Sequence, residues 1–383
     1  MKIPNQFNDI RPFEPEELPA VYDRLLANPQ FQAVLKFLYP AVPLETIAQQ
    51  MYACKTNIDF QLAFCYKFLK DILAKQSTGC DMDISEISNQ ECYTFMSNHR
   101  DIVLDSALLD MLLIEKKFTT TCEIAIGDNL LSIPWVQDIV RVNKSFIVKR
   151  GLMARERLEF SHTLSEYMHF AIKEKHENLW IAQREGRSKD SNDQTQRSVL
   201  KMLTLGGEGS VIDRLKALRI APLAISYEYD PCDYLKAAEF QAKRDDVNWK
   251  KGAMDDVISM RMGIMGYKGK IYYHAACCIN DYLDSLEKVQ MNNAELLDTV
   301  ALHIDKEIYR NYQLYPNNYI ALDLLTGKND HKDKYTPEEE AKFEQYLAQQ
   351  LNKIELPNRD EAFLTKCMLE MYANPAKNYL NSI

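Results

Sequence analysis

Apolar residues recur at three- and four-residue steps over residues 13–80, which is the spacing of amphipathic helices. The pattern is clearest in FQAVLKFLYP (31–40) and FQLAFCYKFLKDILA (60–74), and Pro40 and Pro43 punctuate the two stretches. The sequence therefore predicts an N-terminal helical unit, which we place at residues 1–87.

From about residue 88 the pattern changes to short apolar runs that alternate with helical stretches. The runs predict strands at 92–97, 121–127, 145–150, 179–184 and 219–228. Between them, helices are predicted from Asp105 onward (DSALLDMLLIEKK) and over 154–175. This alternation predicts an α/β core at 88–235, with a mostly parallel sheet flanked by helices. Residues 236–383 are predicted to form a mainly helical C-terminal extension.

Composition narrows the class of protein. A net charge of -9 argues against sequence-independent binding to nucleic acid, which needs a broad basic face. The N-terminus lacks the apolar core of a signal peptide, and no run reaches the roughly 18 apolar residues of a membrane span. The nine cysteines form no Cys-x-x-Cys pair, and their odd number favours reduced thiols. We expect a cytoplasmic protein whose contact with a membrane, if any, is peripheral on its inner face.

The segment SNHRDIVLDS (97–106) carries the first candidate chemistry. His99 follows a predicted strand, at the end of the sheet where open α/β folds bind ligands. A nearby carboxylate, Asp105 or Asp101, could orient the imidazole. A surface histidine followed by an Asp helix cap is the alternative interpretation. A kinase catalytic loop also opens with His-Arg-Asp, but it needs an Asn where this chain has Ser106.

Three further segments end or interrupt predicted strands. Lys149 and Arg150 close the strand in VNKSFIVKR, where two cations could hold a phosphate. Glu185, Gly186, Arg187 and Ser188 follow the strand in WIAQR, and the glycine would let the backbone approach a ligand closely. Pro222 interrupts the buried strand RIAPLAISYE, which indicates either an edge strand or the wall of a site. Solvated strand ends and an ordinary polar loop remain the alternatives for the first two.

Taken in order, the four segments resemble the four sequence blocks of the glycerol-3-phosphate and lysophosphatidate acyltransferase family. SNHRD…D is similar to the family's Asn-His block, KSFIVKR to its Phe-Ile-x-Arg block, EGRS to its Glu-Gly-x-Arg-Ser block and IAPLAISYE to its proline block. The resemblance covers roughly residues 88–230. Two spacings differ: five residues separate His99 from Asp105 where the family has four, and Gly186 adjoins Arg187 where the family has a residue between.

The resemblance implies a soluble α/β acyltransferase in phospholipid synthesis. His99 would act as general base with Asp105 as its partner, and Arg150 and Arg187 would hold the acceptor phosphate, with Lys149, Glu185, Gly186, Ser188 and Pro222 around the substrate. The donor would be an acyl carrier protein or coenzyme A thioester, the acceptor glycerol 3-phosphate or its 1-acyl derivative, and no cofactor is implied. Another lipid acceptor, or a non-catalytic protein that binds lipids or acyl carriers, remains open because of the altered spacings.

Two other signals have simpler interpretations. HAACC (274–278) places His274 three residues from Cys277, but no second Cys/His pair matches it, so a buried helix or strand is favoured over a metal site. Lys243, Arg244, Lys250 and Lys251 could form a basic patch for an acidic carrier protein or for lipid headgroups. A solvated helix face is the alternative.

Overall fold

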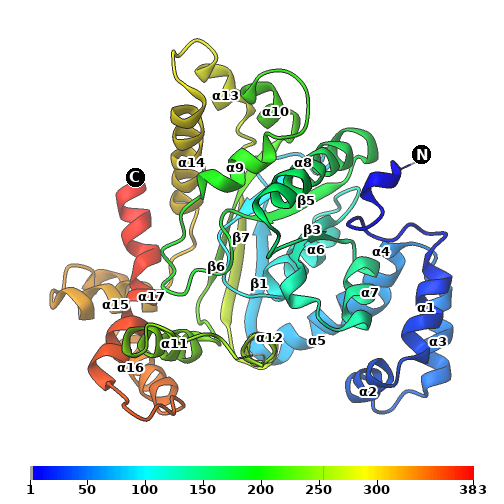
Figure 1. The fold of residues 1–383 in the computed structure, drawn as a ribbon. Helices are drawn as coiled ribbons and strands as arrows, with labels where there is room; N and C mark the ends of the chain where they lie inside the picture. Colours follow the sequence, from blue (N-terminus) through cyan, green and yellow to red (C-terminus); the bar gives the residue numbers. More distant parts are fainter. Residues whose placement is uncertain (1–2, 253) are drawn as a thin grey trace.

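A computed structural model describes residues 3–252 and 254–383, and Figure 1 shows its arrangement of helices around a central sheet. The sheet has seven strands in the order β1-β7-β6-β2-β5-β3-β4. The β6–β7 pairing is antiparallel and the other pairings are parallel. The strands are β1 (Ser77–Asp83), β2 (Thr94–Ser97), β3 (Cys122–Gly127), β4 (Ser145–Val148), β5 (Asn178–Ala182), β6 (Ile220–Tyr227) and β7 (Gly269–Ala275).

The predicted α/β class with a mostly parallel sheet is confirmed. The five predicted strands correspond to β2 through β6. Strands β1 and β7 lie in segments predicted to be helical, within 1–87 and 236–383, so all three predicted units contribute to the sheet. β1 was missed because an edge strand needs no apolar alternation, and STGCDMD has one fully buried residue, Met82.

Helices cover both faces of the sheet, since neighbouring strand residues point to opposite sides. Phe95 of β2 packs with the helices of one face, and Met96 packs with those of the other. The first face is covered by α5 (Lys67–Gln76) and α6 (Leu104–Glu115). The second is covered by α8 (Ala154–Phe170), α9 (Arg197–Leu203), α10 (Val211–Ala217), α13 (Asn280–Leu286) and α14 (Asn293–Arg310).

Two further clusters of buried residues flank this core, at the right and left of Figure 1. The N-terminal cluster is formed by α1 (Leu18–Ala27), α2 (Pro29–Leu38), α3 (Leu44–Ala53), α4 (Asn57–Phe60) and α7 (Pro134–Val142). The C-terminal cluster is formed by α11 (Asp233–Asp245), α15 (Pro316–Thr326), α16 (Pro337–Leu351) and α17 (Glu361–Ser382). A last helix, α12 (Asp255–Met265), lies between α11 and α5 at the bottom of Figure 1.

Short irregular helices complete the chain. They are the π-helical η2 (Gln61–Tyr66) and η4 (Ala171–Lys175) and the 3-10 turns η1 (Asn5–Phe7), η3 (Asp128–Leu130) and η5 (Lys332–Lys334). Among the described residues, no helix combines the length and the apolar character needed to cross a bilayer.

Candidate active site

The turn after β2 is held by Asn98, which is fully buried. Its side-chain amide donates to the Ile225 carbonyl of β6 at 2.8 Å, and its oxygen accepts from the Ile225 N–H at 2.8 Å. An Asn side chain thereby continues the hydrogen bonding of the sheet for one step beyond the end of β2. His99 consequently leaves the sheet in a defined direction, at the carboxyl end of the parallel strands.

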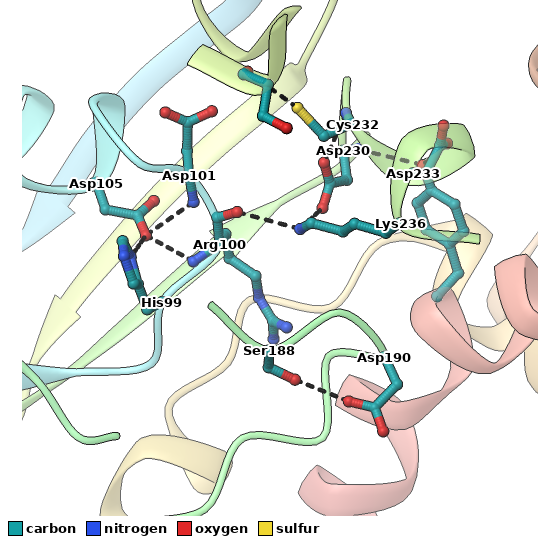
Figure 2. A network of polar contacts seen from close by, with 12 residues as sticks. His99, Arg100, Asp101, Asp105, Ser188, Asp190, Asp230, Cys232, Asp233 and Lys236 are labelled. Atoms are coloured by element: carbon teal, nitrogen blue, oxygen red, sulfur yellow. Dashed lines mark hydrogen bonds and ion pairs between the residues drawn. The ribbon is translucent and has the colours of Figure 1, made fainter. Parts of the chain in front are cut away.

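The imidazole of His99 contacts the carboxylate of Asp105, as Figure 2 shows. His99 Nδ1 lies 2.8 Å from Asp105 Oδ2, and the side chains of His99 and Asp105 are 13% and 1% exposed. The same oxygen accepts from the backbone N–H groups of Arg100 at 2.6 Å and Asp101 at 3.0 Å. Three donors converging on one carboxylate oxygen fix its position, so the orientation of the imidazole is set by the fold.

Asp101, the other candidate partner of His99, has a different task. Its Oδ1 accepts from the N–H groups of Val103 at 2.9 Å and Leu104 at 2.8 Å, which caps the start of α6. Burial, followed by the neighbouring Asp105 carboxylate, raises the pKa of Asp101, and Arg187 opposes that shift. The chain between His99 and Asp105 therefore folds back through an Asp-capped turn, which accommodates the five intervening residues.

A buried ion pair supports the His99 turn from behind. Arg100 Nη1 lies 3.0 Å from Asp193 Oδ2, and the side chains are 8% and 0% exposed. The two atoms are close enough to attract each other, yet neither forms an aligned hydrogen bond. Burial raises the pKa of Asp193, and Arg100 opposes the shift. Asp193 Oδ1 also accepts from the His99 backbone N–H at 3.5 Å, so this pair braces the catalytic candidate directly.

Sequence reasoning missed Asn98, Arg100, Trp180 and Asp193 as parts of the site. The ring of Trp180 on β5 lies edge-on to the His99 ring, with 5.4 Å between the centroids, and its indole N–H donates to Ser97 Oγ at 3.0 Å. Asn98 could have been noticed because it immediately precedes the histidine. Asp193 carries no local signal, since 94 residues separate it from the His99 N–H that it accepts.

Arg187 turns towards the Asp101 and α12 side of the site. Its side chain is 7% exposed, and its nearest charged partner is Asp256 of α12, with 3.9 Å between Nη2 and Oδ1. Arg187 Nη1 is buried and has no hydrogen-bond partner among the described residues. A buried guanidinium with unused N–H groups can donate hydrogen bonds to an anionic group that binds beside it.

Arg150 and Glu185 come together at the ends of β4 and β5. Arg150 Nη1 lies 3.5 Å from Glu185 Oε1, and both side chains are substantially exposed. Lys149 is placed differently, because its ammonium lies 5.6 Å from the centre of the Phe160 ring on α8. No contact within the described part of the chain joins Arg150 or Lys149 to the His99 imidazole. The two predicted phosphate-binding arginines thus occupy different surroundings.

Gly186 and Ser188 flank Arg187 in the loop that follows β5. Gly186 has a φ of +70°, a left-handed conformation that glycine adopts without strain, and a Cβ at this position would contact nothing within 4 Å. The glycine is therefore required by the turn and not by a close neighbour. Ser188 is fully buried and donates to Asp190 Oδ1 at 2.8 Å within its own loop, as Figure 2 shows.

The expectation that Pro222 marks an edge strand is wrong. β6 lies between β7 and β2, and Pro222 is buried opposite Met96 of β2. Its carbonyl accepts from the Ala276 N–H just beyond β7 at 2.9 Å, and the antiparallel ladder itself begins where Leu223 faces Ala275. The missing N–H of proline therefore removes only the reciprocal bond at the end of this ladder. Pro222 faces Met96 within the sheet, before the carboxyl end where His99 emerges, and its role as a wall of the site stays a prediction.

The metal interpretation of His274 finds no support in the geometry. His274 is on β7, with Nε2 at 3.2 Å from Glu86 and Nδ1 at 3.6 Å from Asp83. Among the described residues no group of three or more His, Cys, Asp or Glu side chains is placed to hold a metal ion.

The arrangement has a definite chemical capacity. Nδ1 is engaged by Asp105, and no described residue bonds to the other ring nitrogen, Nε2. A neutral imidazole whose Nδ1–H donates to a carboxylate presents a basic Nε2 that can take a proton from a hydroxyl or thiol. Comparisons with models of protein families and with curated proteins find no match to this chain.

Proposed function

We propose that this protein transfers a fatty acyl group from a thioester to the hydroxyl of glycerol 3-phosphate or its 1-acyl derivative. The observation that carries the proposal is the buried Asp105–His99 pair at the carboxyl end of a mostly parallel sheet, with Nδ1 and Oδ2 at 2.8 Å. The proposal also rests on the resemblance of the four sequence segments to the acyltransferase blocks.

The chemistry is a direct transfer with His99 as general base. His99 Nε2 takes the proton of the acceptor hydroxyl while its oxygen forms a bond to the thioester carbonyl carbon. The C–S bond then breaks, and the departing thiolate takes the proton back from the imidazolium. Asp105 stabilises the imidazolium, as the carboxylate of a Ser-His-Asp triad does. Within the described residues no Ser, Thr or Cys side chain is hydrogen-bonded to the His99 ring, which favours a route without an acyl-enzyme.

Arg187 is the residue best placed to bind the acceptor phosphate. Arg187 Nη1 is buried and has no hydrogen-bond partner among the described residues, whereas Arg150 is more exposed and lies 3.5 Å from Glu185. Burial, followed by Lys243, Lys251, Arg187 and Lys236, lowers the pKa of Lys189 to about 7. Lys189 and Lys243 are paired with Glu239 and Lys251 with Asp256, so the unused donor of Arg187 is the feature that favours an anionic acceptor.

The test is lipid analysis of purified protein with labelled acyl thioesters and a panel of acceptors. We expect label to appear in lysophosphatidate or phosphatidate with the wild-type protein and to disappear with His99→Ala. Transfer to a lysophospholipid or an amino-acid lipid precursor would keep the reaction class and replace the acceptor. A protein that binds acyl lipids equally well with and without His99, and transfers nothing, would be a binding protein and would refute the proposal.

A further inference from the structure

Helix α12 has apolar side chains on two opposite sides. Towards the core, Gly263 packs so closely on the His99 turn that a Cβ there would lie 1.8 Å from Asp101 Oδ2, and Ile264 packs against the buried residues beneath α6. Away from the core, Met254, Val257, Ile258, Arg261 and Met265 form what we call the outer face of α12. Their spacing of three and four residues places them along one side of the helix.

The outer face of α12 is open to solvent. Its four apolar side chains are between 44% and 59% exposed, and Val247 and Tyr267 on either side of the helix are exposed as well. Scattered exposed apolar residues are ordinary on a protein surface, but a contiguous stripe along one helix marks a surface that meets something apolar. The inner side of the same helix already satisfies the core, so the outer stripe has no packing role.

Exposed cations without an ion pair lie on or beside the outer face of α12. Lys250, Arg261 and Lys270 are exposed and form no ion pair within the described part of the chain. Of the two acids that begin the helix, Asp256 pairs with Lys251 and Arg187, whereas Asp255 accepts only the Gly252 N–H, at 2.8 Å, and keeps its charge. An apolar stripe bordered by unpaired cations matches the acyl and phosphate layers of an anionic bilayer.

From this arrangement we infer that the outer face of α12 is the surface by which the protein docks on an anionic lipid bilayer, beside its active site. This inference rests on the proposed function for its purpose, because a lipid product made at His99 would then emerge at the membrane. The contacts of α12 with Asp101 and Arg187 place the docked helix against the site itself.

The experiment measures co-sedimentation of the full-length protein with vesicles of phosphatidylglycerol and phosphatidylcholine, or of phosphatidylcholine alone. The wild type is expected to bind the anionic vesicles and to bind more weakly as salt is added. Val257→Asp with Ile258→Asp should lower the partition coefficient roughly tenfold or more, because two charges replace inserted apolar groups. Arg261→Glu should lower it by roughly fivefold or more. Both variants alter exposed side chains, and thermal unfolding verifies that they fold.

A matched control is Leu302→Asp on α14, where a 70% exposed leucine lies outside the proposed surface. It should bind vesicles as the wild type does. Wild-type protein that ignores both kinds of vesicle, or a Val257/Ile258 variant that binds as tightly as the wild type, would overturn the inference. Equal loss with Leu302→Asp would do the same. If the surface instead served an acidic carrier protein, the variants would weaken binding of that protein and leave vesicle binding unchanged.

Activity with soluble substrates separates this inference from the proposed function. With a short-chain acyl thioester and glycerol 3-phosphate in solution, the Val257/Ile258 variant should turn over at the wild-type rate. If the wild type transfers no acyl group but binds vesicles through the outer face of α12, the proposed reaction fails and the docking surface stands. If transfer occurs and the variants bind vesicles normally, the docking surface fails and the reaction stands.

Discussion

At the amino end of the parallel strands, buried charges are completely paired. Lys144 donates to Thr120 Oγ1, the Thr121 carbonyl and Glu177, at 2.7 to 2.9 Å. Glu123 accepts from Lys175 at 2.6 Å and from the Tyr167 hydroxyl. A cavity of about 190 Å³ adjoins Lys144 and Lys175, yet none of these side chains has a buried polar atom without a partner.

At the carboxyl end, some buried charged side chains have hydrogen-bonding atoms without a partner among the described residues. Asp105 Oδ1 and Arg187 Nη1 are buried and have no hydrogen-bond partner among the described residues. The cavity behind Arg100, lined also by Tyr312 and Tyr372, is only about 30 Å³, too small for a lipid substrate. Both ends of the sheet bury ionisable groups, so burial alone does not identify a site. What distinguishes the functional candidate is hydrogen-bonding capacity that the fold leaves unused.

The largest expected effect separates the two ends by activity. His99→Ala should lower kcat by about 10²–10⁴-fold, the usual contribution of a general base, with little change in KM or in thermal stability. Steady-state kinetics with both substrates varied and a melting curve measure this. His162→Ala, at a half-exposed histidine of α8, is the matched control and should keep wild-type kinetics. Wild-type kinetics in His99→Ala would show that the His99 site at the carboxyl end of the sheet does not carry out the reaction.

The next effect concerns stability at the amino end. Glu123→Ala should lower the free energy of unfolding by about 3–5 kcal/mol, because it leaves Lys175 and Tyr167 buried without their carboxylate. Denaturant titration measures the loss, and kcat per folded molecule should be unchanged. Glu159→Ala, which removes an exposed pair with Arg155, should change stability by less than about 0.5 kcal/mol. A catalytic defect in Glu123→Ala would show that full pairing does not mark a purely structural region.

A smaller effect tests the unused donor of Arg187. Arg187→Ala should raise the KM for the acceptor by about 10–100-fold, which corresponds to the ~1.5–3 kcal/mol of a charged hydrogen bond. The KM for the acyl donor should hardly move. Because the Arg187 side chain is 7% exposed and lies near Asp256, a melting curve of the variant separates lost packing from the change in KM. Arg197→Ala, at an exposed arginine of α9 paired with Asp298, is the control. A raised donor KM with an unchanged acceptor KM would assign Arg187 to the donor instead.

The last prediction is a pH dependence of stability at the amino end. Burial raises the pKa of Asp110 from 3.8 to about 7, while its carboxylate accepts from the Cys122 N–H and from Gln61. The folded state therefore holds a proton that the unfolded chain loses near pH 4, so stability should fall as pH rises towards 7. The slope is at most about 1.4 kcal/mol per pH unit. Asp110→Asn should lack this component in parallel denaturant titrations, and identical slopes in both proteins would contradict it.

Local pattern was sufficient for much of the fold. The strands β2 to β6 are short apolar runs, and the helix that follows His99 is a periodic stretch. In both, the order of apolar residues along the chain predicts which side chains are buried. β1 and β7 were not predicted, because a strand at a sheet edge, or one with mixed polarity, is stabilised mainly by the strands beside it. β1 pairs with β7 across about 191 residues of chain, and such a pairing has no local signature.

The sequence by itself determined the kind of site: a histidine and two aspartates in a turn after a strand, with arginines at the ends of other strands. Tertiary structure alone decided the partnerships. Asp105 faces the imidazole because Asp101 is used to cap α6, and Arg187 keeps a free donor while Arg150 is paired. Asn98 is hydrogen-bonded to Ile225 because β6 lies beside β2. Pro222 is accommodated in the sheet because the ladder between β6 and β7 begins at the next residue. The physical reason is that hydrogen bonds and ion pairs depend on distances and angles, which only the packed chain sets.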